Sequence, residues 1–271
     1  MTGEQEVVKV GKHEEERIKK ATLELENWKP ITALGKKVKN KEITDLDEIL
    51  DSGQKIYEKE IVELLVPDLE VDLLLLGQSK GKFGGGQRRA FRQTQKKTRE
   101  GNKPKFSTVA VVGNKNGYVG LDFGKSKETV PAREKATRNA KVSIIKIARG
   151  CGSWQCDCKT PHTIPFAVEG KCGSVVVKLM PAPKGTGLMA EKELAKILEK
   201  AGIVDVWSKS RGKTSSRTNL LKAGFSALKK LSQTHTLPEH KEKIGIVAGK
   251  VAIKKENDEW RKTRKGRTNR S

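Results

Sequence analysis

Three cysteines and a histidine lie close together near the middle of the chain, at Cys151, Cys156, Cys158 and His162. Zinc takes four nitrogen or sulfur ligands in a tetrahedral arrangement, and a connector that contains glycine and proline could fold around such an ion. The spacing C-x4-C-x-C-x3-H departs from the paired C-x2-C pattern of common zinc sites. Reduced thiols of an intracellular protein are the other interpretation. The sequence leaves both alternatives open, a structural zinc ion or a set of free cysteines.

Residues 211–215 (RGKTS) resemble the end of a phosphate-binding P-loop. That motif needs a glycine five residues before Gly212, so that backbone N–H groups can surround the phosphate, and this position is Trp207. Catalytic residues are equally scarce, because no cysteine has the sequence surroundings of a nucleophile and no pair of acidic residues stands out from the surface charge. We therefore expect no enzymatic activity and no required cofactor.

Positive charge is the strongest feature of the composition. The 271 residues include 56 Lys and Arg against 33 Asp and Glu, for a net charge of +23. Residues 1–76 hold 12 basic and 18 acidic side chains, for −6, and residues 77–271 hold 44 and 15, for +29. The basic residues are densest at 78–105 and 261–271. This pattern predicts a polyanionic partner, with nucleic acid favoured, bound by the part of the chain after Gly77.

The low aromatic content narrows the kind of nucleic acid. Only 4% of residues are aromatic, whereas proteins that bind single strands stack successive bases on aromatic side chains. Basic runs that also contain glycine and asparagine are better suited to the phosphates and 2′-hydroxyls of folded RNA. The longest apolar run, 73–76, is far too short to span a bilayer, so we expect no membrane contact. The four cysteines cluster between Cys151 and Cys172 and do not resemble a secreted disulfide framework, so we expect a reducing, cytoplasmic setting.

The elements that carry these residues follow from the apolar pattern and the turn signals. Asn116-Gly117 between two β-type runs is a strong hairpin signal, because both residues tolerate positive φ. Thr44, followed by acidic residues, resembles a helix N-cap within a region of short helices at 31–65. We expect a first unit of three strands and a helix, at 88–97, 106–112, 118–123 and 127–148, with a loop at 98–104 and an earlier helix at 13–26. A second unit is expected to contain strands at 166–169, 174–180 and 203–208 and helices at 189–201 and 219–231.

Two separated motifs carry a family resemblance. The segments KPKFSTVAVVGNKNGYVGLDFGKSKETVPAREKATRNAK (Lys103 to Lys141) and GKCGSVVVKLMPAPKGTGL (Gly170 to Leu188) closely resemble the universal small-subunit ribosomal protein S-five family, whose eukaryotic member is called S-two. The segment PHTIPFAVEGKCGS resembles the archaeal and eukaryotic branch, and the cysteine cluster looks archaeal.

The resemblance implies an α+β fold. It predicts a β-β-β-α domain similar to double-stranded-RNA-binding domains, followed by a left-handed βαβ-type domain, with extensions at both ends. The expected boundaries are an N-terminal extension at 1–59, the rRNA-binding domain at 60–149, a connector at 150–165, the second domain at 166–233 and a basic tail at 234–271.

The resemblance also implies which residues bind. The family's RNA-contacting loop corresponds to Lys96, Lys97, Arg99, Lys103 and Lys105. Its second RNA-facing turn corresponds to Asn114, Lys115, Asn116, Gly117 and Tyr118, and the start of its basic helix to Lys125, Lys127 and Arg133. Its loop toward the neighbouring small-subunit ribosomal protein S-four corresponds to Pro183, Lys184, Gly185, Thr186 and Gly187.

From this resemblance we expect a structural constituent of the small ribosomal subunit in the cytoplasm. It would bind small-subunit rRNA, contact protein S-four, stabilise the arrangement of body and head near the mRNA entry side and support translational accuracy. The alternative is a cytosolic zinc-dependent enzyme that processes or modifies RNA, with its zinc at the Cys/His cluster.

Overall fold

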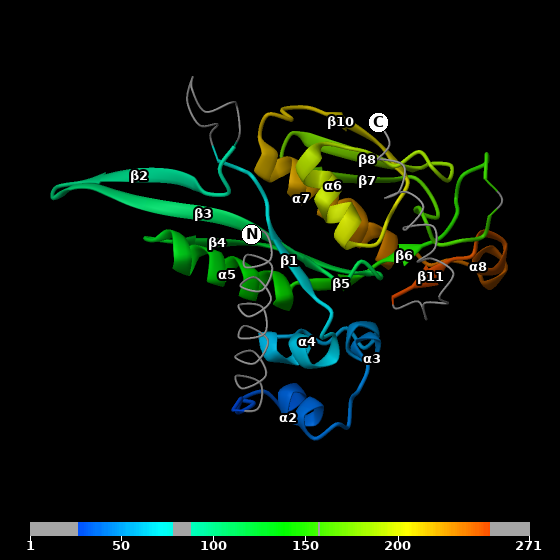
Figure 1. Cartoon of the computed structure of the whole chain (residues 1–271), viewed down its shortest axis with the longest axis horizontal. Helices are drawn as coiled ribbons and strands as arrows, with labels where there is room; N and C mark the ends of the chain where they lie inside the picture. The colour runs from blue at the N-terminus through cyan, green and yellow to red at the C-terminus, as the bar shows by residue number, and fades with distance from the viewer. Residues whose placement is uncertain (1–26, 78–87, 157, 250–271) are drawn as a thin grey trace, which may run out of the picture.

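The computed structural model describes residues 27–77, 88–156 and 158–249. Two β-sheets with helices against their faces form the body of the molecule, so the expected α+β class is confirmed (Figure 1). Among the described residues, no helix is long and apolar enough to cross a membrane. The helix expected at 13–26 and the most basic part of the tail, 261–271, lie outside the described residues.

Short helices precede the first sheet, as expected for residues 31–65. They are α2 (Ala33–Lys39), α3 (Leu46–Asp51) and α4 (Lys59–Leu65). Their buried apolar side chains pack with Tyr118 and Ile144, and this cluster attaches the helices to the first sheet. The predicted N-cap at Thr44 is wrong, because α3 begins after Asp45, whose side chain makes no capping hydrogen bond.

The first sheet contains five strands, all antiparallel to their neighbours. They are β1 (Glu70–Leu73), β2 (Arg92–Thr98), β3 (Gly101–Gly113), β4 (Tyr118–Ser126) and β5 (Ile144–Lys146). Their order is β1-β3-β4-β5, and β2 pairs with the first half of β3 on the same edge as β1. Three consecutive strands, β2 to β4, are then followed by a helix, as the sequence predicted.

Side chains of β3 alternate between two buried faces of this sheet. Ala110 and Val112 pack with alanines of α5 (Thr129–Val142), while Val109 and Val111 belong to a cluster on the other face. The helix expected at 127–148 is therefore too long. Its apolar spacing continues into β5, because Ile144 and Ile145 of that strand pack into the same sheet.

The strands β2 and β3 extend beyond the rest of the sheet as a two-stranded arm (Figure 1). β4 pairs with β3 only as far as Phe106, whereas β2 pairs with it as far as Gly101. Only Arg99 and Glu100 form the turn between the paired ends of the strands. The loop predicted at 98–104 is therefore wrong, since most of it belongs to β3.

The second sheet has the order β7-β8-β10-β9. Its strands are β7 (Val168–Cys172), β8 (Val175–Pro181), β9 (Leu188–Met189) and β10 (Val206–Arg211), and its helices are α6 (Lys192–Lys200) and α7 (Arg217–Gln233). β9 and β10 are parallel and are joined through α6, so β9-α6-β10 is a βαβ unit, whereas the other pairings are antiparallel.

One hydrophobic cluster joins the two sheets. It includes Val109 and Leu121 of the first sheet, Val177 of the second, Leu198 of α6 and Leu228 of α7. The helices α6 and α7 lie between the sheets (Figure 1). Both sheets therefore bury apolar side chains against the same two helices.

The connector after the first sheet pairs with the C-terminal part of the described chain. β11 (Val247–Ala248) is antiparallel to β6 (Ala148–Arg149), and α8 (Pro238–Ile244) precedes β11. The N–H of Cys151 also donates to the carbonyl oxygen of Ile244, at 3.0 Å. The beginning of the expected tail is thus packed against the connector.

Ion pairs link α6 and the hairpin turn after β3 to β1. The ammonium group of Lys200 contacts carboxylates of Glu70 and Asp72 on β1, and Lys115 contacts Glu70 at 2.7 Å. Hydrogen bonds with Lys115 and Lys200 lower the pKa of Glu70. Burial alone would lower the pKa of Lys200, but its bonds with Asp72 and Glu70 outweigh burial and raise it.

Acid is expected to weaken this link. Because the folded pKa of Glu70 lies below its ordinary value of 4.5, its stabilisation is complete above that pH and is lost as the pH falls through the folded pKa. Glu70→Gln should lower the Tm by about 2 °C at neutral pH and by less at about pH 3. Thermal unfolding of both proteins at each pH measures this, and an equal difference at the two pH values would contradict the assignment.

Candidate RNA-binding surface and Cys/His cluster

The arm gathers basic residues on one face. Residues directly opposite one another in antiparallel strands point to the same face. Lys96 is opposite Lys103, and Ser107 lies between Arg92 of β2 and Lys125 of β4. This basic arm face carries five exposed cations: Arg92, Lys96, Lys103, Lys105 and Lys125.

The arm is poorly stabilised by its own contacts. Lys96 and Lys103 are like charges in directly opposed positions, which destabilises a strand pair. Within the described part of the arm, the only ion pair joins Lys103 to Glu100 at 2.9 Å, with both side chains exposed. A two-stranded ribbon without cover is only marginally stable in water. A polyanion along the basic arm face would reduce the repulsion and cover the strands.

The other expected contacts of this region lie apart from that face. Lys97 alternates to the opposite face of the arm, and Arg99 is in the turn. Lys127 is exposed just before α5. Arg133 is exposed on α5, with its guanidinium carbon 5.7 Å from the ring centre of Phe91. The structure therefore brings together only part of the predicted set.

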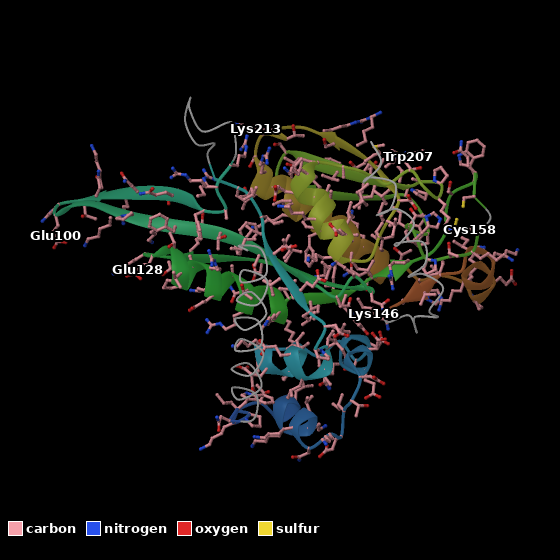
Figure 2. All side chains as sticks on the ribbon, viewed as in Figure 1. Glu100, Glu128, Lys146, Cys158, Trp207 and Lys213 are labelled. Carbon is pink, nitrogen blue, oxygen red and sulfur yellow. The ribbon has the colours of Figure 1, made fainter. Side chains whose placement is uncertain are left out.

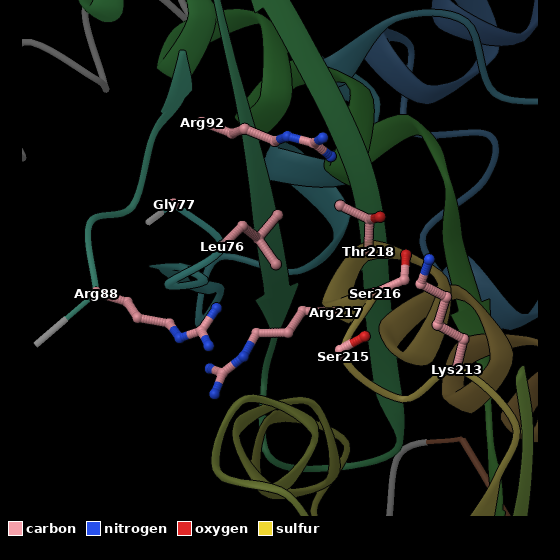
Figure 3. Close-up of a pocket in the computed structure, with 9 residues that line it drawn as sticks. All are labelled: Leu76, Gly77, Arg88, Arg92, Lys213, Ser215, Ser216, Arg217 and Thr218. Atoms are coloured by element: carbon pink, nitrogen blue, oxygen red, sulfur yellow. The ribbon is translucent and has the colours of Figure 1, made fainter. Parts of the chain in front are cut away.

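A basic pocket lies at the base of the arm (Figure 3). Its volume is about 380 Å³, and it is lined from the arm side by Arg88 and Arg92 and from the α7 side by Lys213 and Arg217. The guanidinium groups of Arg88 and Arg217 extend toward each other in Figure 3. Arg217 also pairs with Glu191, at 3.2 Å. Three serine and threonine residues add hydroxyl groups to the lining: Ser215, Ser216 and Thr218.

The P-loop-like segment forms one wall of this basic pocket. It joins β10 to α7, which is the strand-to-helix setting of a P-loop. Gly212 has a φ of +89°, and a Cβ there would lie 1.9 Å from the carbonyl oxygen of Ser174. This glycine therefore permits close packing against the turn between β7 and β8. The sequence did not identify Arg88, Lys213 and Arg217 as binding residues, because their convergence depends on the packing of the two sheets.

The hairpin turn after β3 is occupied by contacts within the chain. The Asn114 Oδ1 accepts hydrogen bonds from the N–H groups of Asn116 and Tyr118, at 2.8 and 3.2 Å. The N–H groups of Lys115 and Gly117 donate to carbonyl oxygens at the C-terminal end of α6, at 2.9 and 3.1 Å. The turn therefore joins the first sheet to α6.

Side chains strengthen the same junction. Arg149 donates to the Asn116 Oδ1 at 2.8 Å and to the Gly249 carbonyl at 3.2 Å, and burial lowers its pKa to about 10. The hydroxyl of Tyr118 donates to Asp47 of α3, at 2.8 Å. For these hairpin side chains, contact with RNA would have to compete with contacts that hold the connector, the tail and the N-terminal helices.

The loop predicted to contact a neighbouring protein is fixed by one buried carboxylate. The N–H groups of Gly185 and Gly187, both with positive φ, donate to the Asp205 Oδ1 at 3.1 and 2.7 Å. Thr186 donates to a backbone carbonyl within the loop, and Lys184 is exposed. The loop thus presents a defined surface.

The connector brings the four predicted metal ligands together. One ligand atom from each of Cys151, Cys156, Cys158 and His162 lies within 4.8 Å of all the others. The His162 Nε2 is 3.4 Å from the sulfur of Cys151 and 3.9 Å from that of Cys156. Figure 2 places Cys158 at the opposite end of the molecule from Glu100 in the arm turn.

The thiols of this Cys/His cluster differ in pKa because their surroundings differ. Burial raises the pKa of Cys151 to about 11, with a smaller effect from Cys158. Burial would also raise the pKa of Cys158, but hydrogen bonds with Thr160 and with the other two cysteines outweigh it and lower the value to about 6. The His162 Nδ1 lies 2.8 Å from the Oδ2 of the buried Asp205.

Sequence comparisons identify the family. The small ribosomal subunit protein uS5 of Nanoarchaeum equitans is 48% identical over 230 residues, which cover 85% of this chain and 99% of that protein. The protein of the same name from Methanocaldococcus jannaschii is 45% identical over 227 residues, 84% of this chain and 98% of that protein. The chain belongs to the ribosomal protein S5 family. The predicted resemblance, including its archaeal branch, is confirmed.

The S5 family models match two ranges of the chain. The model described as ribosomal protein S5, N-terminal domain, matches residues 77–148, and that described as ribosomal protein S5, C-terminal domain, matches 170–243. S5 proteins are structural and need no cofactor, and the relatives lend no support to the alternative of a zinc-dependent enzyme. The Cys/His cluster lies between the two matched ranges.

Proposed function

We propose that this S5 chain is a structural constituent of the small ribosomal subunit in the cytoplasm and binds small-subunit rRNA. The observation that carries the proposal is the basic arm face, a row of exposed cations on a ribbon that no other described element covers. Family membership supports it, because the relatives are named small ribosomal subunit proteins.

The proposed rRNA surface continues from the arm into the basic pocket. Arg92 belongs to both, and Lys125 extends the basic arm face to β4. Lysine and arginine side chains replace counterions around phosphates, and the strand register fixes their spacing. Lys127 and Arg133 would meet RNA that passes the α5 side of the arm. The proposed rRNA-binding domain is 60–149, with 166–233 as the second domain.

The loop with Lys184, Gly185, Thr186 and Gly187 is the proposed contact with protein S-four. Its support is the defined shape that Asp205 gives to the loop, together with the family resemblance. The same resemblance supports a position near the mRNA entry side and a role in translational accuracy. We assign the hairpin turn mainly to joining the two sheets, because its polar groups are bonded within the chain.

The salt dependence of rRNA binding tests the electrostatic mechanism. The basic arm face and the basic pocket together offer eight cations, Arg88, Arg92, Lys96, Lys103, Lys105, Lys125, Lys213 and Arg217. If about six to ten phosphates are neutralised, affinity should fall by about 10³–10⁵ between about 50 and about 200 mM salt. Filter binding to small-subunit rRNA measures it, and a flat salt dependence would exclude the mechanism.

Sedimentation of a cell lysate at physiological salt tests the assembly. We expect the chain to migrate with small subunits in a constant ratio to their rRNA. A chain that stays wholly in the low-molecular-weight fractions would contradict the proposed function.

A further inference from the structure

We propose that Cys151, Cys156, Cys158 and His162 bind a structural zinc ion, and that Asp205 is the residue that positions His162 for it. The proposal concerns the connector, which lies at the opposite end of the molecule from the arm turn (Figure 2). It does not depend on rRNA binding.

The four ligand atoms are already close to the separations that zinc requires. With bonds of about 2.3 Å to sulfur and 2.0–2.1 Å to nitrogen, the ligands of a tetrahedral zinc ion lie about 3.4–3.8 Å apart. The sulfurs of Cys151 and Cys156 lie 3.4 and 3.9 Å from the His162 Nε2, and the whole set lies within 4.8 Å. Side-chain movements of a few tenths of an ångström to about one ångström would complete the site.

Asp205 fixes the ring nitrogen that faces the thiols. Its Oδ2 lies 2.8 Å from the His162 Nδ1, so an ionised Asp205 accepts a hydrogen from that nitrogen and leaves the Nε2 lone pair free. The Nε2 is the atom that approaches Cys151 and Cys156. A carboxylate behind the imidazole is the usual second contact of a histidine that binds zinc.

The connector is held by hydrogen bonds and by the buried Ile164, with almost no regular secondary structure. Between β6 and β7 the described residues form no helix or strand, only an isolated bridge between Gly150 and Thr163. Connections of this length without secondary structure are uncommon in compact domains unless a functional site orders them. A bound ion would supply that order, because metal-binding free energy adds directly to folding free energy.

The ligand chemistry selects zinc. Three sulfur atoms and one imidazole nitrogen in a tetrahedral arrangement match a structural zinc site, whereas magnesium and calcium prefer oxygen ligands. The three cysteines bind as thiolates, and any thiol protons are released to solvent, while His162 binds as the neutral ring. All four positions are filled by protein, so the site holds the fold and leaves no place for a substrate.

The site also connects to the loop proposed to contact protein S-four. The Asp205 Oδ2 faces His162, and its Oδ1 accepts from Gly185 and Gly187. One buried carboxylate thus joins the zinc ligand to that loop. A zinc ion that fixes His162 and Asp205 would therefore stabilise the loop conformation that Asp205 holds. This step alone rests on the proposed function.

Metal content of the purified full-length chain is the direct test. After exhaustive dialysis against metal-free buffer, elemental analysis should find about one zinc per chain. The protein refolded with Co²⁺ in place of zinc should show thiolate-to-cobalt charge-transfer absorption and the d–d bands of a tetrahedral site. A wild-type chain with less than about a tenth of an equivalent of zinc and no such bands would overturn the proposal, whatever its affinity for rRNA.

Two serine variants provide a matched comparison. Cys158→Ser removes a partly exposed member of the cluster, and Cys172→Ser changes a partly exposed cysteine of β7 outside it. Only the first should lose zinc and the cobalt spectrum, while circular dichroism reports the fold of both. Equal zinc retention by the two variants would contradict the assignment.

Asp205→Asn tests the positioning role separately. An asparagine can still accept hydrogen bonds from the loop, but its amide N–H₂ would face the His162 Nδ1 and favour the ring form protonated on Nε2, which cannot bind metal. Zinc affinity should fall by about 10–100-fold in competition with a chelator. An unchanged affinity in a folded variant would remove Asp205 from the proposal.

Discussion

The double change Lys96→Glu and Lys103→Glu is expected to weaken binding to small-subunit rRNA about a hundredfold at about 0.1 M salt. The two lysines are directly opposed on the basic arm face and are both exposed. Each phosphate contact contributes about 0.9 to the slope of log affinity against log salt, so each lost contact costs somewhat less than tenfold at this concentration. The new carboxylates add repulsion. The salt slope should therefore fall by about two.

Matched control variants distinguish an effect of the basic arm face from an effect of the arm as a whole and from an effect of net charge. Lys97→Glu changes an adjacent residue on the opposite face of the arm, so it should cost less affinity than Lys96→Glu. Lys36→Glu with Lys37→Glu removes two exposed lysines of α2, far from the arm, and should cost little. If Lys96→Glu and Lys97→Glu are equivalent, the basic arm face is not the binding face. If the α2 double variant matches the arm double variant, only net charge matters.

The arm shows where sequence reasoning about this fold stops. Two β-type runs on either side of Asn116-Gly117 predicted the strands at 106–112 and 118–123, and the consecutive apolar residues of β3 are buried on both faces of the sheet. In the arm, the strand at 88–97 was predicted, but its partner at 101–105 has no apolar run, since its side chains are exposed. Residues 98–104 were consequently predicted as a loop. Pro104 is tolerated there because the other edge of β3 has no partner strand at this residue, since β4 pairs with β3 only from Phe106.

The sequence likewise predicted only part of each candidate site. The types and spacing of the Cys/His cluster could be predicted, because all its members lie in one short segment. Asp205 could not, since it lies 43 residues after His162 and reaches it only through the fold of the second sheet. The basic pocket likewise combines Arg88 with Arg217, which are separated by most of both sheets. The hairpin turn was predicted correctly as a turn, but its bonds to α6 follow from the shared core.

That shared core leads to a second large expected effect, the loss of stability in Gly170→Ala. Gly170 is buried in β7, where α7 crosses closely. A Cβ at this position would lie 2.0 Å from the carbonyl oxygen of Ala223 and 2.5 Å from the amide nitrogen of Ala227. Both atoms belong to the backbone of α7, so no side chain can rotate away. The helix itself would have to move from the sheet.

Movement of α7 would disturb both sheets, because its buried leucines share one cluster with Val109 and Leu121. Overpacking usually costs about 1–3 kcal/mol, and a backbone clash belongs at or above the upper end. We expect Gly170→Ala to lower the free energy of unfolding by about 3 kcal/mol, or the Tm by about 6–12 °C. Urea denaturation and thermal unfolding of the full-length chain measure these values.

Gly150→Ala is the matched control, since this glycine is also buried and its φ is not positive. The nearest atoms to its Cβ would be side-chain carbons of Ile246 and Ile244, at 3.3 and 3.4 Å, which can shift by a few tenths of an ångström, and the carbonyl oxygen of Ile244 at 3.4 Å, an ordinary van der Waals distance. Its cost should stay below about 1 kcal/mol. If both variants lose a similar free energy of unfolding, the close crossing of α7 over β7 is not the reason that Gly170 must be glycine. A single unfolding transition in Gly170→Ala would further support one core for both sheets, because a clash confined to the second sheet would otherwise leave the first to unfold separately.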